Sequence, residues 1–129
     1  MWNMSSATFT RLDDYSSLTN GTLWLLNLTD DCTVDFEIMQ VDSNVGAGLF
    51  NVYATGGLTY FTLRHLGLTD SVIGTWLKLR LRIENGEATL SLIDDPAKSR
   101  TNSISEAPTR LRFFINNFTE LRFRNIRIY

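Results

Sequence analysis

The stretch from Trp76 to Ile93, WLKLRLRIENGEATLSLI, restricts the fold more than any other part of the chain. Apolar and polar residues alternate on both sides of an Asn-Gly pair. This is the strongest short-range signal for a β-hairpin, because a type I′ turn needs positive φ at both central positions. With Asn85 and Gly86 in the turn, one face of the hairpin becomes apolar and the other polar. The sequence therefore predicts the register as well as the two strands.

The predicted register assigns each side chain of this hairpin to a face. The apolar face would contain three cross-strand pairs, which are Leu79 with Leu92, Leu81 with Leu90, and Ile83 with Ala88. The polar face would contain two pairs, which are Arg80 with Ser91 and Arg82 with Thr89. We expect the apolar face to join the core, since a slip of one residue would expose all of it.

The rest of the chain repeats the signals of short strands separated by turns. Strand character is found at 8–12, 22–28, 33–40, 48–54, 58–65, 76–84, 87–93, 110–116 and 120–129. Turn residues lie at 19–21, 29–31, 56–57, 94–96 and 116–117. The chain has 129 residues and neither a repeat nor a linker. We therefore expect residues 1–129 to form a single all-β domain, a two-sheet antiparallel β-sandwich.

Two details are predicted for the C-terminal third. In the last strand the apolar residues change phase, with Leu121 and Phe123 on one phase and Ile126 and Ile128 on the other. A β-bulge at 124–125 would turn all four inward. The segment 94–109 contains both prolines and is expected to be a loop with a short edge strand, where missing amide donors do least harm.

Several of these residues resemble the concanavalin A-like sandwich superfamily, especially its laminin-G-like and carbohydrate-binding members. In that superfamily a Trp opens a strand, a Gly-centred hairpin follows, and the chain closes on an aromatic-x-Asn-apolar-x-apolar strand. The matching positions are Trp76, Asn85, Gly86, Phe123, Asn125, Ile126, Ile128 and Tyr129. CTVDFEIMQ resembles the strand that enters the sandwich opposite the final one. The resemblance covers about residues 20–129 and implies a jelly roll whose curved sheet carries ligand on its exposed face.

The resemblance also implies a function and a setting. Sandwiches of this size are similar to those of phage tail and baseplate proteins, so the chain is expected to be a noncatalytic carbohydrate-binding module, extracellular or virion-associated. It would bind a polysaccharide or oligosaccharide as part of a larger or multimeric assembly. The alternative is a structural or protein-interaction sandwich that docks a neighbouring virion or surface protein. No signal peptide and no membrane span are visible, and the net charge of −2 does not favour nucleic acid.

Sugar binding needs aromatic rings and planar hydrogen-bonding groups on one surface. Outward phases supply them on two predicted strands, with Asn51 and Tyr53 on the first and Tyr60, Thr62 and Arg64 on the second. Phe50, Val52, Phe61 and Leu63 would face the core. If this hairpin lies beside the 76–93 hairpin, the same surface would continue over Arg80, Arg82, Thr89 and Ser91. Trp76 shares the phase of Arg80 and is expected to cover the end of the sheet or to line a groove. The alternative is that these polar side chains only solvate a sheet.

Asp35 and Glu37 share the polar phase of one strand, with α-carbons about 6.6 Å apart. Side-chain freedom could bring the carboxyls to the ~5–5.5 Å of a retaining glycosidase pair. The hydrolases of the resembled superfamily use three acids, Glu-x-Asp-x-(x)-Glu, and here Met39 and Gln40 stand in the third place. We therefore expect no enzyme. The two carboxylates would join the binding surface or pair with arginines of a neighbouring strand.

Other reactive residue types are sparse, so no cofactor is expected. A structural calcium ion is the alternative, since adjacent aspartates at 13–14, 30–31 and 94–95 supply loop oxygens, although such pairs also form turns. Cys32 is interpreted as a structural residue at a strand start, and His65 as a core-facing histidine at a strand end. A basic cluster without many nearby acids lies near the C-terminus and could meet an anionic glycan or a neighbouring domain: Arg110, Arg112, Arg122, Arg124 and Arg127.

Overall fold

The computed structural model describes the backbone of residues 2–5, 8–11, 15–26, 31–42, 45, 50–54, 57–104 and 108–129. Side chains are described for residues 15–18, 31–42, 45, 61–104 and 120–129. The elements in chain order are β1 (Trp2–Ser5), β2 (Thr8–Arg11), β3 (Ser16–Leu26), β4 (Cys32–Gln40), β5 (Phe50–Ala54), β6 (Gly57–Phe61), the 3₁₀ helices η1 (Leu63–Leu66) and η2 (Asp70–Val72), β7 (Leu77–Glu84), β8 (Glu87–Leu92), β9 (Ser99–Ser103) and β10 (Pro108–Ile128).

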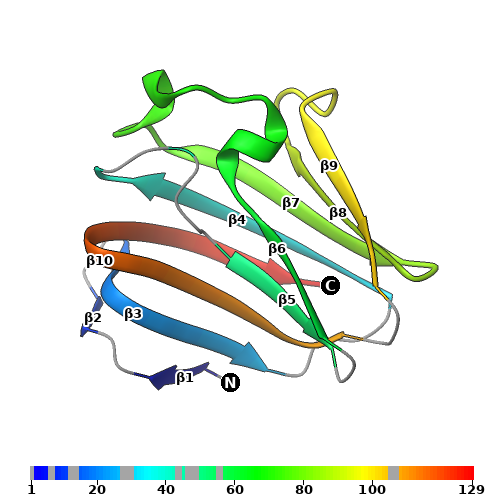
Figure 1. The fold of residues 1–129 in the computed structure, drawn as a ribbon, viewed down its shortest axis with the longest axis horizontal. Coiled ribbons are helices and arrows are strands. Elements are labelled where there is room, and N and C mark those ends of the chain that lie inside the picture. Colours follow the sequence, from blue (N-terminus) through cyan, green and yellow to red (C-terminus); the bar gives the residue numbers. More distant parts are fainter. Residues whose placement is uncertain are drawn as a thin grey trace.

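The strands pair antiparallel in the order β1-β3-β10-β4-β7-β8-β9, with β2 on β3 and the β5–β6 hairpin on β10. Strand β10 has different neighbours along its two halves. Residues 108–113 pair with β5, whereas residues 121–128 pair with β4, and β3 accompanies both halves with a register shift between Ile115 and Glu120. Figure 1 shows β3 and β10 bending together, so that the sheet folds over into two layers. The predicted antiparallel β-sandwich is confirmed.

The core lies between these layers and follows from the alternation of the strands. Val34, Phe36 and Ile38 of β4 are buried, and β7 and β8 contribute Leu79, Leu81, Ile83, Ala88 and Leu90. Phe61 at the end of β6 and Leu63 and Leu66 of η1 belong to the same buried cluster. Each buried Leu, Ile or Phe side chain stabilises the fold by about 1.5–3 kcal/mol. The two layers are therefore held together by one apolar interior.

The hairpin of β7 and β8 has the predicted register at every position. Leu81 pairs with Leu90, and Arg82 pairs with Thr89, with the other pairs in step. Asn85 and Gly86 form the turn with φ values of 52° and 74°, as a type I′ turn requires. The apolar face is buried and the polar face is not.

The predicted strand at 58–65 is wrong beyond Phe61. Thr62 ends the extended segment and caps η1: its Oγ1 accepts from the backbone N–H of His65, and His65 Nδ1 accepts from the backbone N–H of Thr62, both at 3.3 Å. Phe61 and Leu63 are buried as predicted. Thr62, expected to face outward, is only 3% exposed, because the capping bonds hold its side chain inside.

The predicted turns at 19–21 and 116–117 are also wrong, because both segments lie inside the bent strands β3 and β10. Strand β1 was not predicted. The bulge is confirmed by a register shift between Arg124 and Arg127 and by φ of 55° at Asn125. It turns Ile126 toward the core but leaves Ile128 42% exposed, contrary to expectation. The short edge strand expected within 94–109 is β9.

The hairpin turn gives a test of the fold. Gly86→Ala should lower the free energy of unfolding by about 1–2 kcal/mol, because alanine resists positive φ. A Cβ at Gly86 would meet only Ile104 O at 3.6 Å, so the loss comes from the backbone. Urea denaturation measures it. The neighbouring Glu87→Ala, at an exposed position, should change the value by less than about 0.5 kcal/mol. Equal losses in both variants would contradict the turn assignment.

Candidate functional site

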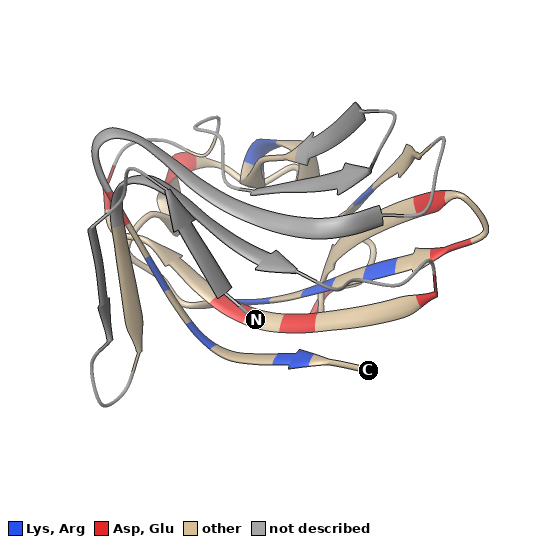
Figure 2. Cartoon of the chain, turned by 90° about the horizontal axis from the view of Figure 1, so that it is seen from below, with Lys and Arg blue, Asp and Glu red and all other residues tan. Residues whose placement is uncertain are grey.

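The outward side chains of four adjacent strand segments form one polar surface, here called the outer face. Because Val34, Phe36 and Ile38 point inward, the alternate residues of β4 point outward, and the cross-strand pairing extends this surface over β7, β8 and the second half of β10. The outer face consists of Asp35, Glu37, Met39, Lys78, Arg80, Arg82, Thr89, Ser91, Arg122, Arg124 and Arg127. Figure 2 shows the acidic positions of β4 between two strands with basic positions.

Asp35 is the centre of a hydrogen-bond network on this face. Arg80 binds it with two bonds, from Nε to Oδ1 at 2.7 Å and from Nη2 to Oδ2 at 2.9 Å. Tyr129 donates its hydroxyl to Oδ2 at 2.9 Å and accepts from Arg80 Nη2 at 3.3 Å. Chiefly because of the hydrogen bonds from Arg80, the pKa of Asp35 lies below its usual value. This bidentate geometry fixes the guanidinium plane while 44% of the Arg80 side chain stays exposed.

Glu37, two residues along β4, is held from the other side. Arg124 donates from Nε and Nη2 to Oε1 at 3.2 and 3.1 Å, and Asn125 donates to Oε2. Asn125 occupies the bulge of β10 with positive φ, which directs its side chain at Glu37. The pKa of Glu37 is lowered, first by the bond from Asn125 and then by Arg124, with a further effect of the charge on Lys78.

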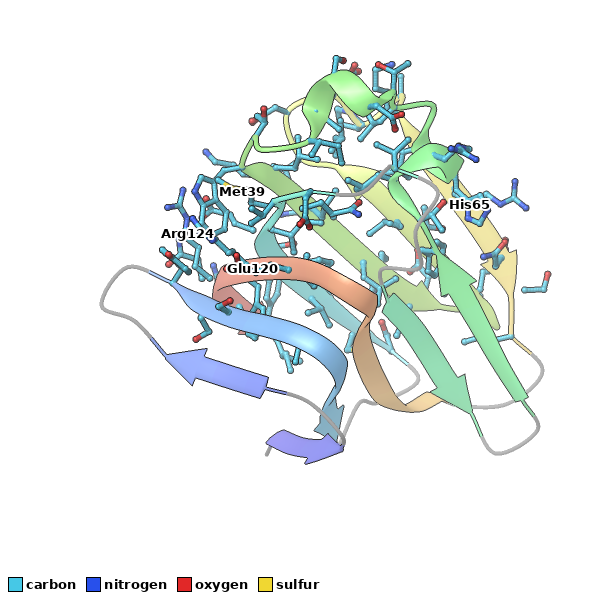
Figure 3. The ribbon with its side chains drawn as sticks, turned by 60° about the vertical axis from the view of Figure 1, so that its left-hand side comes forward. Met39, His65, Glu120 and Arg124 are labelled. Atoms are coloured by element: carbon cyan, nitrogen blue, oxygen red, sulfur yellow. The ribbon has the colours of Figure 1, made fainter. Side chains whose placement is uncertain are left out.

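Aromatic rings and guanidinium groups stack at one end of the outer face. The Arg124 guanidinium lies 3.9 Å from the centroid of the Trp76 ring, and the rings of Trp76 and Tyr15 pack edge to face with their centroids 6.0 Å apart. Arg122 lies 4.7 Å from the centre of Tyr15 and donates from Nε to Glu120 at 2.8 Å. Figure 3 shows Arg124, Met39 and Glu120 on one side of the sandwich. Trp76, expected to cover the sheet end or line a groove, lies at this end of the outer face in contact with Arg124 and Tyr15.

A second set of ion pairs lies at the opposite end of the outer face. Arg82 lies 2.6 Å from Asp31, which precedes β4, and 3.0 Å from Glu84. These contacts, chiefly the bond to Asp31, raise the pKa of Arg82. Beside them Thr89 shares a hydrogen bond of 2.9 Å with Thr101 of β9. The polar surface thus extends to the edge of the sheet.

The structure brings five of the predicted site residues together on or beside the outer face: Asp35, Glu37, Trp76, Arg80 and Arg82. Arg64 is not among them, because it is exposed on η1, the helix that also carries the labelled His65 in Figure 3. Asn51, Tyr53 and Tyr60 lie on β5 and β6, and their side chains lie outside the described residues. The prediction that the β5–β6 hairpin lies beside the β7–β8 hairpin and continues its surface is wrong. The β5–β6 hairpin pairs with β10, whereas β7 pairs with β4.

The basic cluster near the C-terminus was interpreted wrongly as short of acids. Arg122 pairs with Glu120 and Arg124 with Glu37, and Arg127 acts on Asp35 through its charge. The side chains of Arg110 and Arg112 lie outside the described residues. Sequence reasoning also missed Tyr15, Lys78, Asn125 and Tyr129 as members of the site. Alternation along β7 places Lys78 on the same face as Arg80 and was the signal that could have found it. The proximity of Tyr15, Asn125 and Tyr129 depends on how β3, β4 and β10 lie together, which no local pattern contains.

Cys32 and His65 both lie in surroundings that are typical of structural residues. Cys32 begins β4 and is buried. His65 lies on η1 instead of at a strand end. It is partly buried, and its Nδ1 accepts a hydrogen bond from the backbone N–H of Thr62, so it is a residue at the boundary of the core. Desolvation lowers the pKa of its imidazole.

The aspartates proposed for calcium are not assembled where the structure describes them. Among the described side chains, no three His, Cys, Asp or Glu residues gather as a metal site. Asp94 and Asp95 are exposed, Asp31 pairs with Arg82, and residues 13–14 and 30 lie outside the described residues. Within the described part of the chain no helix is long and apolar enough to cross a membrane.

Comparison with known proteins supports the fold. No protein-family model matches the sequence, and no curated protein matches it significantly. Among solved structures, carbohydrate-binding module CBM66 from Bacillus subtilis is similar with a TM-score of 0.64 and 15% identity, over 98% of this chain and 94% of that one. This chain has the fold of that β-sandwich.

Two enzyme structures are also similar. A putative glycosyl hydrolase from Parabacteroides distasonis has a TM-score of 0.66 and 12% identity, over 100% of this chain and 98% of that one. A family 7 alginate lyase has a TM-score of 0.55 and 10% identity, over 99% of this chain and 77% of that one. At these identities the likeness concerns the fold alone.

The lowered carboxyl pKa values predict an acid-sensitive stability. Asp35, Glu37 and Glu120 each have a pKa in the folded chain below the ordinary value, which is 3.8 for Asp35 and 4.5 for the two glutamates. The folded state therefore binds fewer protons near pH 4 than the unfolded state does. The three carboxylates contribute fully to the free energy of unfolding above about pH 4.5, and this contribution is lost as the pH falls through their lowered pKa values. Urea denaturation from pH 7 to 3 should show a flat upper range and a decline below it.

Arg80→Met separates this effect from general acid denaturation. It removes the main cause of the lowered pKa of Asp35, so the decline below pH 4 should become shallower. Arg64→Met, on η1, removes the same charge elsewhere and should leave the slope unchanged. An unaltered slope in Arg80→Met would contradict the role assigned to that pair.

Proposed function

We propose that this chain is a noncatalytic carbohydrate-binding module that recognises cell-surface polysaccharide through its outer face. The observation that carries the proposal is the network of Arg80, Asp35 and Tyr129. It holds a guanidinium, a carboxylate and a phenol in fixed positions on an exposed sheet. Tyr129 is 53% exposed and offers an aromatic ring next to these polar groups.

A fixed set of planar groups suits the recognition of sugar hydroxyls. Hydroxyls bind best to donors and acceptors that are already oriented, because ordering flexible side chains opposes binding by about 0.5–1.5 kcal/mol each. Asp35 is only 18% exposed at its side chain and accepts three hydrogen bonds, so its position is strongly determined. The network is therefore organised before any ligand arrives.

The state of the carboxyls supports a noncatalytic role. Glycoside hydrolysis needs one carboxylic acid with a raised pKa to protonate the leaving oxygen. Asp35 and Glu37 have lowered pKa values and are both ionised at neutral pH. The third outward position of the strand is Met39, which can neither donate nor accept a catalytic proton. The likeness to CBM66 agrees with a binding module, although lyases and a glycosyl hydrolase are similar too.

The setting we propose is a surface-recognition protein outside the cell or on a virion, of which this chain is an accessory module. An open polar sheet of this kind would bind a sugar chain weakly. Several copies in one assembly would raise the effective affinity without any new contact. A module that docks a neighbouring virion or surface protein would use the same exposed sheet and is the competing function.

A glycan array followed by calorimetry tests the proposal. The chain should bind at least one glycan class, and Arg80→Ala should weaken binding tenfold or more, because it removes the guanidinium and frees Asp35. Tyr129→Phe keeps the ring and removes two hydrogen bonds, the one to Asp35 and the one from Arg80, so its loss should be smaller than that of Tyr129→Ala, which removes the ring as well. Circular dichroism and urea denaturation confirm that each variant is folded.

The alternative location on β5 and β6 is tested with Tyr53→Ala and Tyr60→Ala. These variants should bind normally if the outer face is the site. Loss of binding in them, with Arg80→Ala unaffected, would move the site to the other layer. Absence of every glycan signal, together with capture of a tail or envelope protein, would favour the docking function instead.

The noncatalytic assignment has its own measurement. Incubation with β-glucans should release no reducing ends, and incubation with alginate should produce no absorbance of unsaturated ends. Any activity that disappears in Glu37→Gln, while Met39→Leu retains it, would overturn the assignment.

A further inference from the structure

Two adjacent rows of the outer face have more positive than negative charge. Cross-strand pairing places Glu37 between Arg124 of β10 and Lys78 of β7, and places Asp35 between Arg127 and Arg80 in the same way. Each row therefore has two basic side chains and one carboxylate. We call these six residues the two-row patch. Its excess of positive charge contrasts with the net charge of −2 for the whole chain.

The carboxylates of the two-row patch have little capacity left for a ligand. Asp35 accepts two bonds from Arg80 and one from Tyr129, and Glu37 accepts two from Arg124 and one from Asn125. Their charges are compensated within the sheet. What a ligand meets is therefore dominated by the donors that remain.

Those donors come mainly from Lys78 and Arg127. Among the described residues neither one is in an ion pair, whereas Arg80 and Arg124 are. Lys78 is exposed, and Arg127 is exposed with its guanidinium 4.4 Å from the centre of the Tyr129 ring. An ammonium offers three donors and a guanidinium five, and neither accepts a hydrogen bond. The complementary ligand is rich in acceptors and negatively charged.

The spacing of the two cations favours a polymer over a single small ion. Lys78 and Arg127 lie on the two strands that flank β4 and are one row apart. Strand spacings of about 4.8 Å and row spacings of about 6.7 Å separate their α-carbons by roughly 12 Å. A chain with repeated anionic groups can meet both positions while its hydroxyls contact the exposed Arg80 and Tyr129.

We infer that the ligand class of the outer face is an acidic polysaccharide, with carboxylate or sulfate groups that bind Lys78 and Arg127. This inference rests on the proposed function. It is favoured over single-stranded nucleic acid because base stacking needs accessible rings. The rings of Trp76 and Tyr15 have guanidinium groups 3.9 and 4.7 Å from their centroids, and Arg127 lies 4.4 Å from the centroid of the exposed Tyr129 ring. This leaves too few free ring faces for successive bases to stack.

The test compares charged and neutral forms of the same polymers. Calorimetry is performed with polygalacturonate and its fully methyl-esterified form, and with dextran sulfate and dextran. We expect a dissociation constant at least tenfold lower for the charged member of at least one pair, and a marked weakening between 50 and 500 mM salt, since exposed charges are screened. The pair that responds distinguishes carboxylate from sulfate.

Variants locate the effect. Lys78→Gln with Arg127→Gln should raise the dissociation constant for the charged polymer at least tenfold and leave the fold intact by circular dichroism. Arg64→Gln with Arg100→Gln, on η1 and β9, removes the same total charge away from the two-row patch and should change it less than twofold. Equal losses in both double variants would overturn the inference.

Further outcomes separate it from the proposed function. Equal binding of the neutral and charged forms would overturn the acidic class and leave carbohydrate binding intact. Binding of poly-glutamate or of a single-stranded oligonucleotide as tight as that of the charged polymers would also overturn it. Binding of no glycan, in these pairs or on the array, would overturn both.

Discussion

The alternation of side chains along β4 is the constraint on which the rest of the structure depends. Phe36 and its inward neighbours fill the core between the layers, while Asp35 and Glu37 between them organise the outer face. A slip of one residue would bury both carboxylates and expose Phe36, so the core and the site share one register. Strands β7 and β10 then place basic side chains on both sides of Asp35 and Glu37.

Local rules explain which parts of the fold could be predicted. The Asn85–Gly86 turn fixes a two-residue hairpin by backbone preference alone. After Phe123 the apolar residues change phase, and a β-bulge is the usual way in which a strand keeps such residues on one face. The failures share a cause in tertiary contacts. Thr62 ends β6 through a cap that needs His65 in place, and residues 19–21 and 116–117 stay in strands because β3 and β10 bend as a pair.

The site was predictable in part for the same reason. Asp35, Glu37, Arg80 and Arg82 were found because alternation assigns a face to every residue of a strand. Their partners Arg124, in β10, and Tyr129, directly after it, are far away in the sequence, and only the sheet order shows that β10 lies next to β4. Without that order, Tyr53 and Tyr60 were assigned to a surface that β5 and β6 do not extend.

The edge strand β9 has a consequence for contacts between copies of the chain. Its residues Ser99–Ser103 are all polar and mostly exposed, and the strand is short. An open edge of this kind is a poor template for further strand pairing. Copies of this chain that come close together should therefore have little tendency to merge through that edge into a continuous intermolecular sheet.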